Sequence, residues 1–280
     1  MSMRELLNGG DGRSVTKADA VAYAVNTLIS ELVIRATRDD GVRNYYDIAV
    51  VGYSEPMETA DDGCTAEGIR YLLDDGRRFV PVTELAVREP RRASYTVERT
   101  TCDGTTLLRE EGVDMWIEPW AAGGTPMYEA LFEIRELLRG WCAEPANAES
   151  FPPVVINITD GEASDCNAAE LTDICRGIKG LRTGDGNVLL MNIHITADTA
   201  CKPLLFPTRS ELEAFGVDRY TSMLADCSSV MPSVFNGLIA DSRAEAGVSG
   251  EPYLAMGYNI SPEGLFCMLN IGSRSVTGLQ

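Results

Sequence analysis

The sequence is poor in the residues that catalysis and nucleic-acid binding most often require. A single histidine, His194, occurs in 280 residues, and 24 basic residues face 42 acidic ones, for a formal net charge of −18. Such a negative field argues against nucleic acids and anionic membranes as partners, and it favours cations or basic protein surfaces. The same acidity can also serve solubility alone.

Several catalytic motifs are missing as well. The chain has no Gly-x-x-x-x-Gly-Lys loop, no Gly-x-Ser-x-Gly elbow, no His-Glu-x-x-His pair and no strand that ends in Asp-x-Asp. His194 lies inside an apolar stretch, so we interpret it as a structural, hydrogen-bonded histidine. We therefore expect the protein not to be an enzyme. A metal-assisted phosphohydrolase that uses Asp160 is the catalytic alternative.

The cysteines follow no metal-binding or disulfide pattern. Eight of them are spread along the chain without a C-x-x-C pair, which excludes the usual zinc spacings and a small disulfide scaffold. We expect reduced, mostly structural thiols and a cytoplasmic protein. No apolar run approaches membrane-spanning length and no secretory signal is visible, so we expect no membrane partner.

Hydrophobic periodicity and turn residues predict an α/β fold. Helices are expected over residues 16–38, 126–141, 168–181, 218–227, 232–246 and 262–271. Strands are expected over residues 45–53, 79–82, 154–159, 187–196 and 253–258, and loops over 1–14, 54–68 and 197–217. The alternation of strands and helices predicts βαβ units and a mostly parallel sheet. We expect one domain over residues 1–280, with an inserted hairpin or extended loop at about 88–112.

Two polar residues stand where such a sheet gathers its loops. Asp160 follows the strand 154–159 directly, and Thr125 precedes a helix, with Pro126 suited to the first helical position. Both positions belong to the edge at which α/β proteins bind ligands. Hydroxyl and carboxylate oxygens are the ligands that hard divalent cations prefer. In the plainer alternative, Asp160 is a turn residue and Thr125 a helix cap.

Three other polar residues have simpler interpretations. Ser164 and Asp165 precede the helix expected at 168–181, so we predict that they cap it, although Asp165 could also lie near a metal. Lys17 lies in the first turn of the first predicted helix and is expected to face solvent.

In this arrangement the sequence resembles the von Willebrand factor type A (vWA) domain, and most closely its stand-alone bacterial members. Residues 123–131 look like the family's threonine loop and the helix after it, and residues 155–162 look like its strand-Thr-Asp-Gly segment. Ser2-Met3 and residues 17–26 look like the end of its Asp-x-Ser-x-Ser motif and its first helix. Residues 258–274 look like its carboxyl-terminal end. The resemblance covers almost the whole chain.

The resemblance implies both a fold and a function. The fold is a Rossmann-like three-layer structure with a mostly parallel central sheet and helices on both faces. The function is that of a non-catalytic protein–protein interaction domain with a metal-ion-dependent adhesion site (MIDAS) for Mg²⁺ or Mn²⁺. Residue by residue, Ser2, Thr125 and Asp160 match metal-binding positions, and a carboxylate of the protein partner can complete the metal shell.

The chain departs from the family pattern at its start. The first Asp and the first Ser of Asp-x-Ser-x-Ser would precede Met1, as would the apolar strand that leads into them. We therefore expect the fold to lack its first, central strand and the metal affinity to be weak. We hypothesise an amino-terminally truncated vWA domain. The rival is a degenerate member that acts as a metal-independent scaffold.

Overall fold

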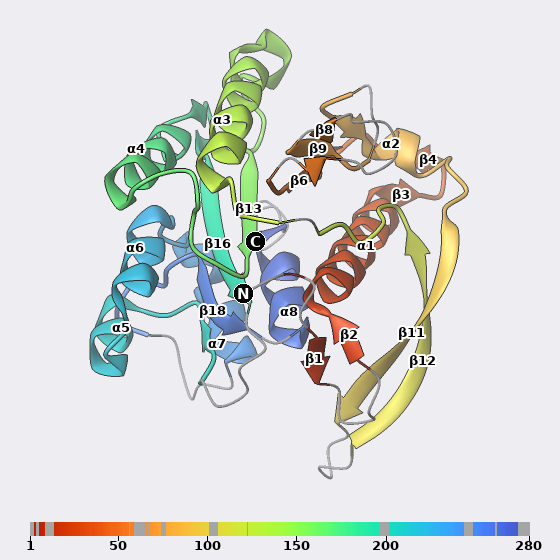
Figure 1. Ribbon diagram of the computed structural model, residues 1–280. Coiled ribbons are helices and arrows are strands. Elements are labelled where there is room, and N and C mark those ends of the chain that lie inside the picture. Colours follow the sequence, from red (N-terminus) through yellow and green to blue (C-terminus); the bar gives the residue numbers. More distant parts are fainter. Residues whose placement is uncertain are drawn as a thin grey trace. The chain divides into compact units, whose positions relative to one another are not determined.

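The structure is a computed structural model, and it describes residues 3, 6–8, 14–55, 57–58, 65–66, 68–73, 77–100, 106–121, 123–195, 202–243, 249–260 and 262–273. The chain divides into two compact units. Unit 1 consists of Met1–Lys17, Tyr53–Ile69 and Ala121–Gln280, and unit 2 consists of Ala18–Gly52 and Arg70–Trp120 (Figure 1).

Unit 1 is built on a four-stranded sheet with the order β13-β16-β18-β17. Its strands are β13 (Val154–Thr159), β16 (Leu189–Ile195), β18 (Met256–Ile260) and β17 (Leu204–Leu205). β13 and β18 each pair with β16 in parallel, and the short β17 is antiparallel to β18. The predicted α/β class with a largely parallel sheet is therefore confirmed.

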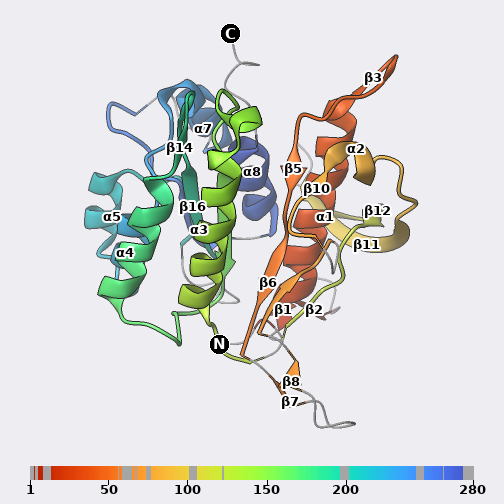
Figure 2. The same cartoon turned by 90° about the horizontal axis from the view of Figure 1, so that it is seen from above.

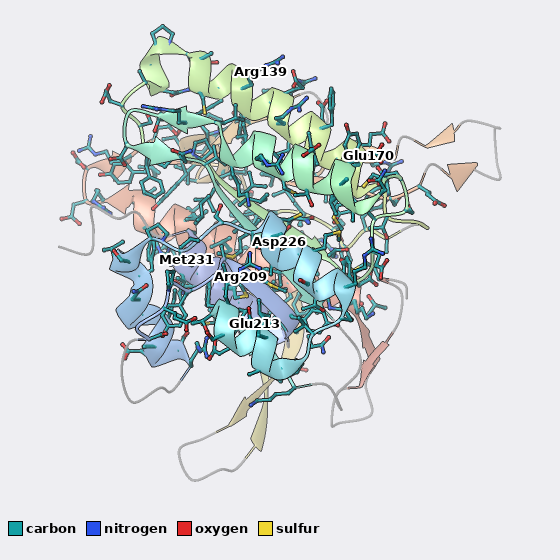
Figure 3. All side chains as sticks on the ribbon, turned by 90° about the vertical axis from the view of Figure 1, so that its left-hand side faces the viewer. Arg139, Glu170, Arg209, Glu213, Asp226 and Met231 are labelled. Atoms are coloured by element: carbon teal, nitrogen blue, oxygen red, sulfur yellow. The ribbon has the colours of Figure 1, made fainter. Side chains whose placement is uncertain are left out.

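Helices cover both faces of this sheet. α4 and α6 contact one side of β16, whereas α8 contacts β13 and β18 from the other side (Figures 1 and 2). The helices of unit 1 are α3 (Met127–Ala143), α4 (Ala168–Lys179), α5 (Arg209–Phe215), α6 (Arg219–Cys227), α7 (Asn236–Ser242) and α8 (Pro262–Gly272). Arg209 of α5 and Asp226 of α6 form a half-exposed ion pair of 2.8 Å (Figure 3). Such an exposed pair contributes little to stability.

The burial of the strands explains their sequences. All seven residues of β16 are buried, because helices cover both faces of this inner strand. A mostly apolar sequence suits such a position, and the two polar residues of the strand, Asn192 and His194, are buried as well. β13 is only half-buried over most of its length and stands at one end of the sheet order. Its last residue, Thr159, and the following Asp160 are buried.

Several predicted loops of unit 1 contain regular structure. β1 (Leu6–Asn8) pairs with β2 (Ser14–Thr16) where a loop was predicted. Likewise β7 (Met57–Glu58) pairs with β8 (Thr65–Ala66). The segment 197–217 contains α5, whose Thr208–Glu211 capping box was a helix signal that the loop prediction overlooked. The remaining short elements are η1 (Pro145–Asn147), η2 (Ser233–Phe235), β14 (Arg182–Thr183) and β15 (Gly186–Asn187).

Unit 2 is organised around α1 (Lys17–Ala36), whose residues from Ala18 onward belong to it. Its core gathers Ile29, Leu73, Val80, Leu85 and Ile117. The other elements are α2 (Val82–Leu85), β3 (Thr37–Arg38), β4 (Gly41–Val42), β5 (Asp47–Ile48), β10 (Val80–Pro81), β11 (Arg91–Thr100) and β12 (Thr106–Met115).

Two predictions for unit 2 have different outcomes. The predicted hairpin is confirmed: β11 and β12 pair in register from Arg91↔Met115 to Thr100↔Thr106, and its tip, residues 101–105, lies outside the described residues. The single strand predicted at 45–53 is wrong. It is divided into β5, which pairs with β10, and β6 (Val51–Tyr53), which pairs with β9 (Ile69–Tyr71).

Two expectations concern the chain as a whole. In the described part, Cys142, Cys166, Cys175, Cys227 and Cys267 are free thiols, in line with the sequence prediction. Among the same residues, no helix has both the length and the hydropathy needed to cross a membrane.

Candidate functional site

The turn after β13 is held by its own threonine. The Thr159 hydroxyl donates to the Gly161 carbonyl (2.8 Å) and accepts from the Gly161 amide (3.2 Å). The Tyr220 hydroxyl of α6 donates to the same carbonyl at 2.6 Å. These contacts fix the backbone on both sides of Asp160, whose side chain is consequently placed at the carboxyl end of the strand.

Thr125 lies against this turn. Its amide donates to the Ser164 hydroxyl (3.0 Å), and the Ser164 amide donates back to the Thr125 carbonyl (2.9 Å). A Cβ atom added to Gly161 would stand 3.7 Å from the Thr125 hydroxyl oxygen. The structure thus brings Thr125 and the Asp160–Gly161 turn together. The capping role predicted for Thr125 is wrong, because α3 begins at Met127 and has no side-chain cap from its N-cap residue, Pro126.

Asp165 caps α3 instead, although α3 precedes Asp165 in the sequence. Its two carboxylate oxygens accept from the amides of Tyr128 (3.1 Å) and Glu129 (2.9 Å) at the start of α3. The prediction that Ser164 and Asp165 cap the following helix is therefore wrong. Asn167 caps α4, in a capping box with Glu170.

Replacement of Asp165 by alanine is expected to lower the free energy of unfolding by about 1–2 kcal/mol, since two amides at a helix start lose an anionic acceptor. Urea denaturation measures this change. Asp173→Ala is the matched control, because Asp173 is exposed on α4 and pairs only within one helical turn, with Arg176. An Asp165 variant as stable as this control would contradict the capping role.

The loop before Thr125 depends on Gly124. Gly124 has a φ of +55°, a conformation that side chains disfavour. The Glu55 side chain packs where a Cβ of Gly124 would stand, and the Glu55 amide donates to the Gly123 carbonyl at 2.6 Å. A second carboxylate therefore lies beside the threonine loop. Sequence reasoning missed Glu55, because its contact with this loop spans almost seventy residues of the chain.

Asp160 faces an internal cation. The Lys17 side chain, expected to face solvent, is instead fully buried, and its Nζ lies 3.5 Å from Asp160 Oδ2. Burial raises the pKa of Asp160 above its ordinary value, and the positive charge of Lys17 opposes this rise. Asp160 Oδ2 is itself a buried atom with no hydrogen-bond partner.

Aromatic side chains surround the same strand ends. The Tyr53 hydroxyl lies 2.9 Å from Asn157 Oδ1 and 3.2 Å from the Ile158 carbonyl oxygen, so its single proton is directed at two acceptors on β13. His194 of β16 is stacked on Tyr258, with ring centroids 4.8 Å apart, and meets Tyr220 edge-on at 5.8 Å. Desolvation raises the pKa of both Tyr53 and Tyr220, so both hydroxyls remain hydrogen-bond donors at neutral pH.

His194 was predicted to be a structural, hydrogen-bonded histidine, and its Nδ1 atom is buried without a hydrogen-bond partner. It is buried, and burial, together with the positive charge of Lys17, lowers its pKa to about 4, while a hydrogen bond with the Asn259 side chain opposes this shift. Asn259 has a left-handed backbone (φ 52°) at the end of β18, a conformation that asparagine tolerates better than most residues. The ring is therefore neutral at physiological pH.

The structure places two of the three residues that were matched to metal-binding positions. Thr125 and Asp160 lie at one turn, and Ser2 lies outside the described residues. No group of three or more His, Cys, Asp or Glu side chains that could hold a metal ion occurs in the ranges that the structure describes. The arrangement around Asp160 therefore offers one buried carboxylate, a neighbouring hydroxyl and an ammonium group.

Comparison of the chain with protein-family models, curated proteins and solved structures found no match.

Proposed function

We propose that the chain is a non-catalytic protein–protein interaction domain of the vWA type, which binds its partner at the carboxyl edge of the four-stranded sheet. One observation carries the proposal: the Thr125 backbone is bonded to Ser164, and the Thr125 hydroxyl oxygen lies beside Gly161, the residue that follows Asp160. The parallel pairing of β13, β16 and β18 and the helices on both faces support a Rossmann-like three-layer arrangement. In the part of the chain that the structure describes, β13 stands at one end of the sheet order, which supports a fold without its central strand.

The oxygen atoms of Asp160 and Thr125 are of the types that a divalent cation prefers as ligands. Asp160 Oδ2 is a buried carboxylate oxygen that accepts no hydrogen bond, and a hydroxyl oxygen lies nearby on Thr125. Mg²⁺ is commonly bound by one or two carboxylates and keeps several waters. Thr125 and Asp160 would hold the ion, with Ser2 as a further hydroxyl ligand, and the ion would supply positive charge for an acidic group of the partner.

The second candidate is a scaffold that binds its partner without metal. The contact of Lys17 with Asp160 favours it, since the carboxylate already has a positively charged neighbour. Under this alternative the same sheet edge binds a partner by shape and hydrogen bonding alone. Mn²⁺ binding to the protein separates the two candidates.

Titration of the full chain with Mn²⁺, followed by electron paramagnetic resonance, tests the metal site. We expect weak binding that Thr125→Val reduces on the order of tenfold, because the hydroxyl oxygen is lost, and that Asp160→Asn abolishes, because the negative charge of the carboxylate is lost. Thr27→Val is the matched control, since the Thr27 hydroxyl bonds the Tyr23 carbonyl within α1. Binding of Mn²⁺ that is equal in all four proteins would refute a site at Thr125 and Asp160.

A further inference from the structure

Lys17 occupies a position that is unfavourable for a lysine unless an anion compensates it. It is the first residue of a 20-residue helix and its side chain has no exposed surface. A helix start carries partial positive charge and disfavours a cation, and burial of an ammonium group adds a desolvation cost. The Asp160 carboxylate, whose side chain is 7% exposed, supplies the opposite charge.

The contact between the two groups is ionic rather than a tight hydrogen bond. The distance from Nζ to Oδ2 is 3.5 Å, whereas charge-assisted hydrogen bonds measure about 2.7–2.9 Å. Asp160 Oδ2 accordingly remains without a hydrogen-bond donor. The carboxylate is thus neutralised by a neighbouring charge while one of its oxygens keeps its capacity to accept a ligand.

We propose that Lys17 is the built-in cation of this site: its ammonium group takes the place of a divalent ion at Asp160, and the two cations exclude one another. This inference rests on the proposed function, since it concerns the same carboxylate. An ion bound directly to Asp160 Oδ2 would lie about 2.1 Å from that oxygen, and therefore within about 6 Å of Nζ. Two cations so close in a buried site repel each other strongly. Divalent binding at Asp160 thus requires that Lys17 withdraw.

Mn²⁺ titration of Lys17 variants of the full chain tests the exclusion. Lys17→Met removes the charge and keeps an unbranched apolar chain, and Lys17→Arg keeps the charge. We expect Lys17→Met to bind Mn²⁺ at least about tenfold more tightly than the wild type, and Lys17→Arg to bind no better than the wild type. The gain must vanish in Lys17→Met/Asp160→Asn. Equal Mn²⁺ affinity of wild type and Lys17→Met would overturn the proposal.

Unfolding measurements in EDTA separate this proposal from the proposed function. Each single variant, Lys17→Met and Asp160→Asn, removes one of the two opposite charges of this buried contact and leaves the other, so the double variant is expected to be more stable than the less stable single variant. Suppose that neither the wild type nor any variant binds Mn²⁺, but the double variant is more stable than the less stable single variant. Lys17 is then the internal cation, and the metal function is wrong. If wild type and Lys17→Met bind Mn²⁺ equally through Asp160, the metal function holds and the exclusion is wrong. Should Lys17→Met fail to fold in EDTA, Mn²⁺ must restore its folding, and failure to do so contradicts the exclusion.

Discussion

Replacement of Asn26 by leucine is expected to lower the free energy of unfolding by about 3–5 kcal/mol. Asn26 is fully buried on α1. Its Oδ1 accepts from the amides of Trp116 (2.8 Å) and Ile117 (2.9 Å), and its Nδ2 donates to the Ile117 carbonyl (3.0 Å). Leucine would leave three backbone groups without these partners, and each buried unsatisfied group costs about 1–3 kcal/mol.

Urea denaturation followed by circular dichroism measures this effect. Asn44→Leu is the matched control, because Asn44 is exposed and the chemical change is the same; such surface changes stay within about 0.5 kcal/mol. An Asn26→Leu protein as stable as the Asn44→Leu protein would show that the side chain does not hold the segment 116–117. If the expected loss is found, the stability of unit 2 depends on the side-chain amide of Asn26, which joins α1 to residues about ninety positions later in the chain.

The elements that sequence reasoning predicted well are those with strong local signals. β16 was predicted from a largely apolar run, and α4 was predicted from its periodicity. The inward positions of α4, namely Leu171, Ile174, Cys175 and Ile178, are all buried. The adjacency of Thr125 and Asp160 followed from a rule of topology: loops at the carboxyl ends of parallel strands gather at one edge. None of these inferences required a specific long-range contact.

Three of the failures involve partners distant in sequence. Asp165 was assigned to the nearest helix, although its carboxylate bonds amides 36 and 37 residues earlier. Lys17 was placed in solvent because lysine is seldom buried without a partner, and its partner, Asp160, is more than a hundred residues away. Likewise, the break between β5 and β6 follows from their pairing with two different strands. Local patterns carry no information about such partners.

Acidification is expected to destabilise the wild-type protein through His194, by about 2 kcal/mol between pH 7.5 and pH 5. The pKa of His194 is about 4 in the folded protein and about 6.5 in an unfolded chain. Between these values the unfolded state binds a proton that the folded state does not, so stability falls as pH decreases through this window. Below pH 4 both states carry the proton, and the total contribution of this group levels off at about 3 kcal/mol.

The chain offers an unusually clean test, since His194 is its only histidine. Unfolding of the wild type and of His194→Phe is compared by urea denaturation at both pH values, which removes the contribution that the acidic residues make to both proteins. Phenylalanine keeps a ring for stacking on Tyr258 and cannot titrate. The difference in stability between the two proteins should shift by about 2 kcal/mol in favour of His194→Phe at pH 5. A difference that is constant with pH would mean that the imidazole is protonated as easily in the folded protein as in the unfolded chain, and that the aromatic environment of Tyr220 and Tyr258 does not exclude the charge.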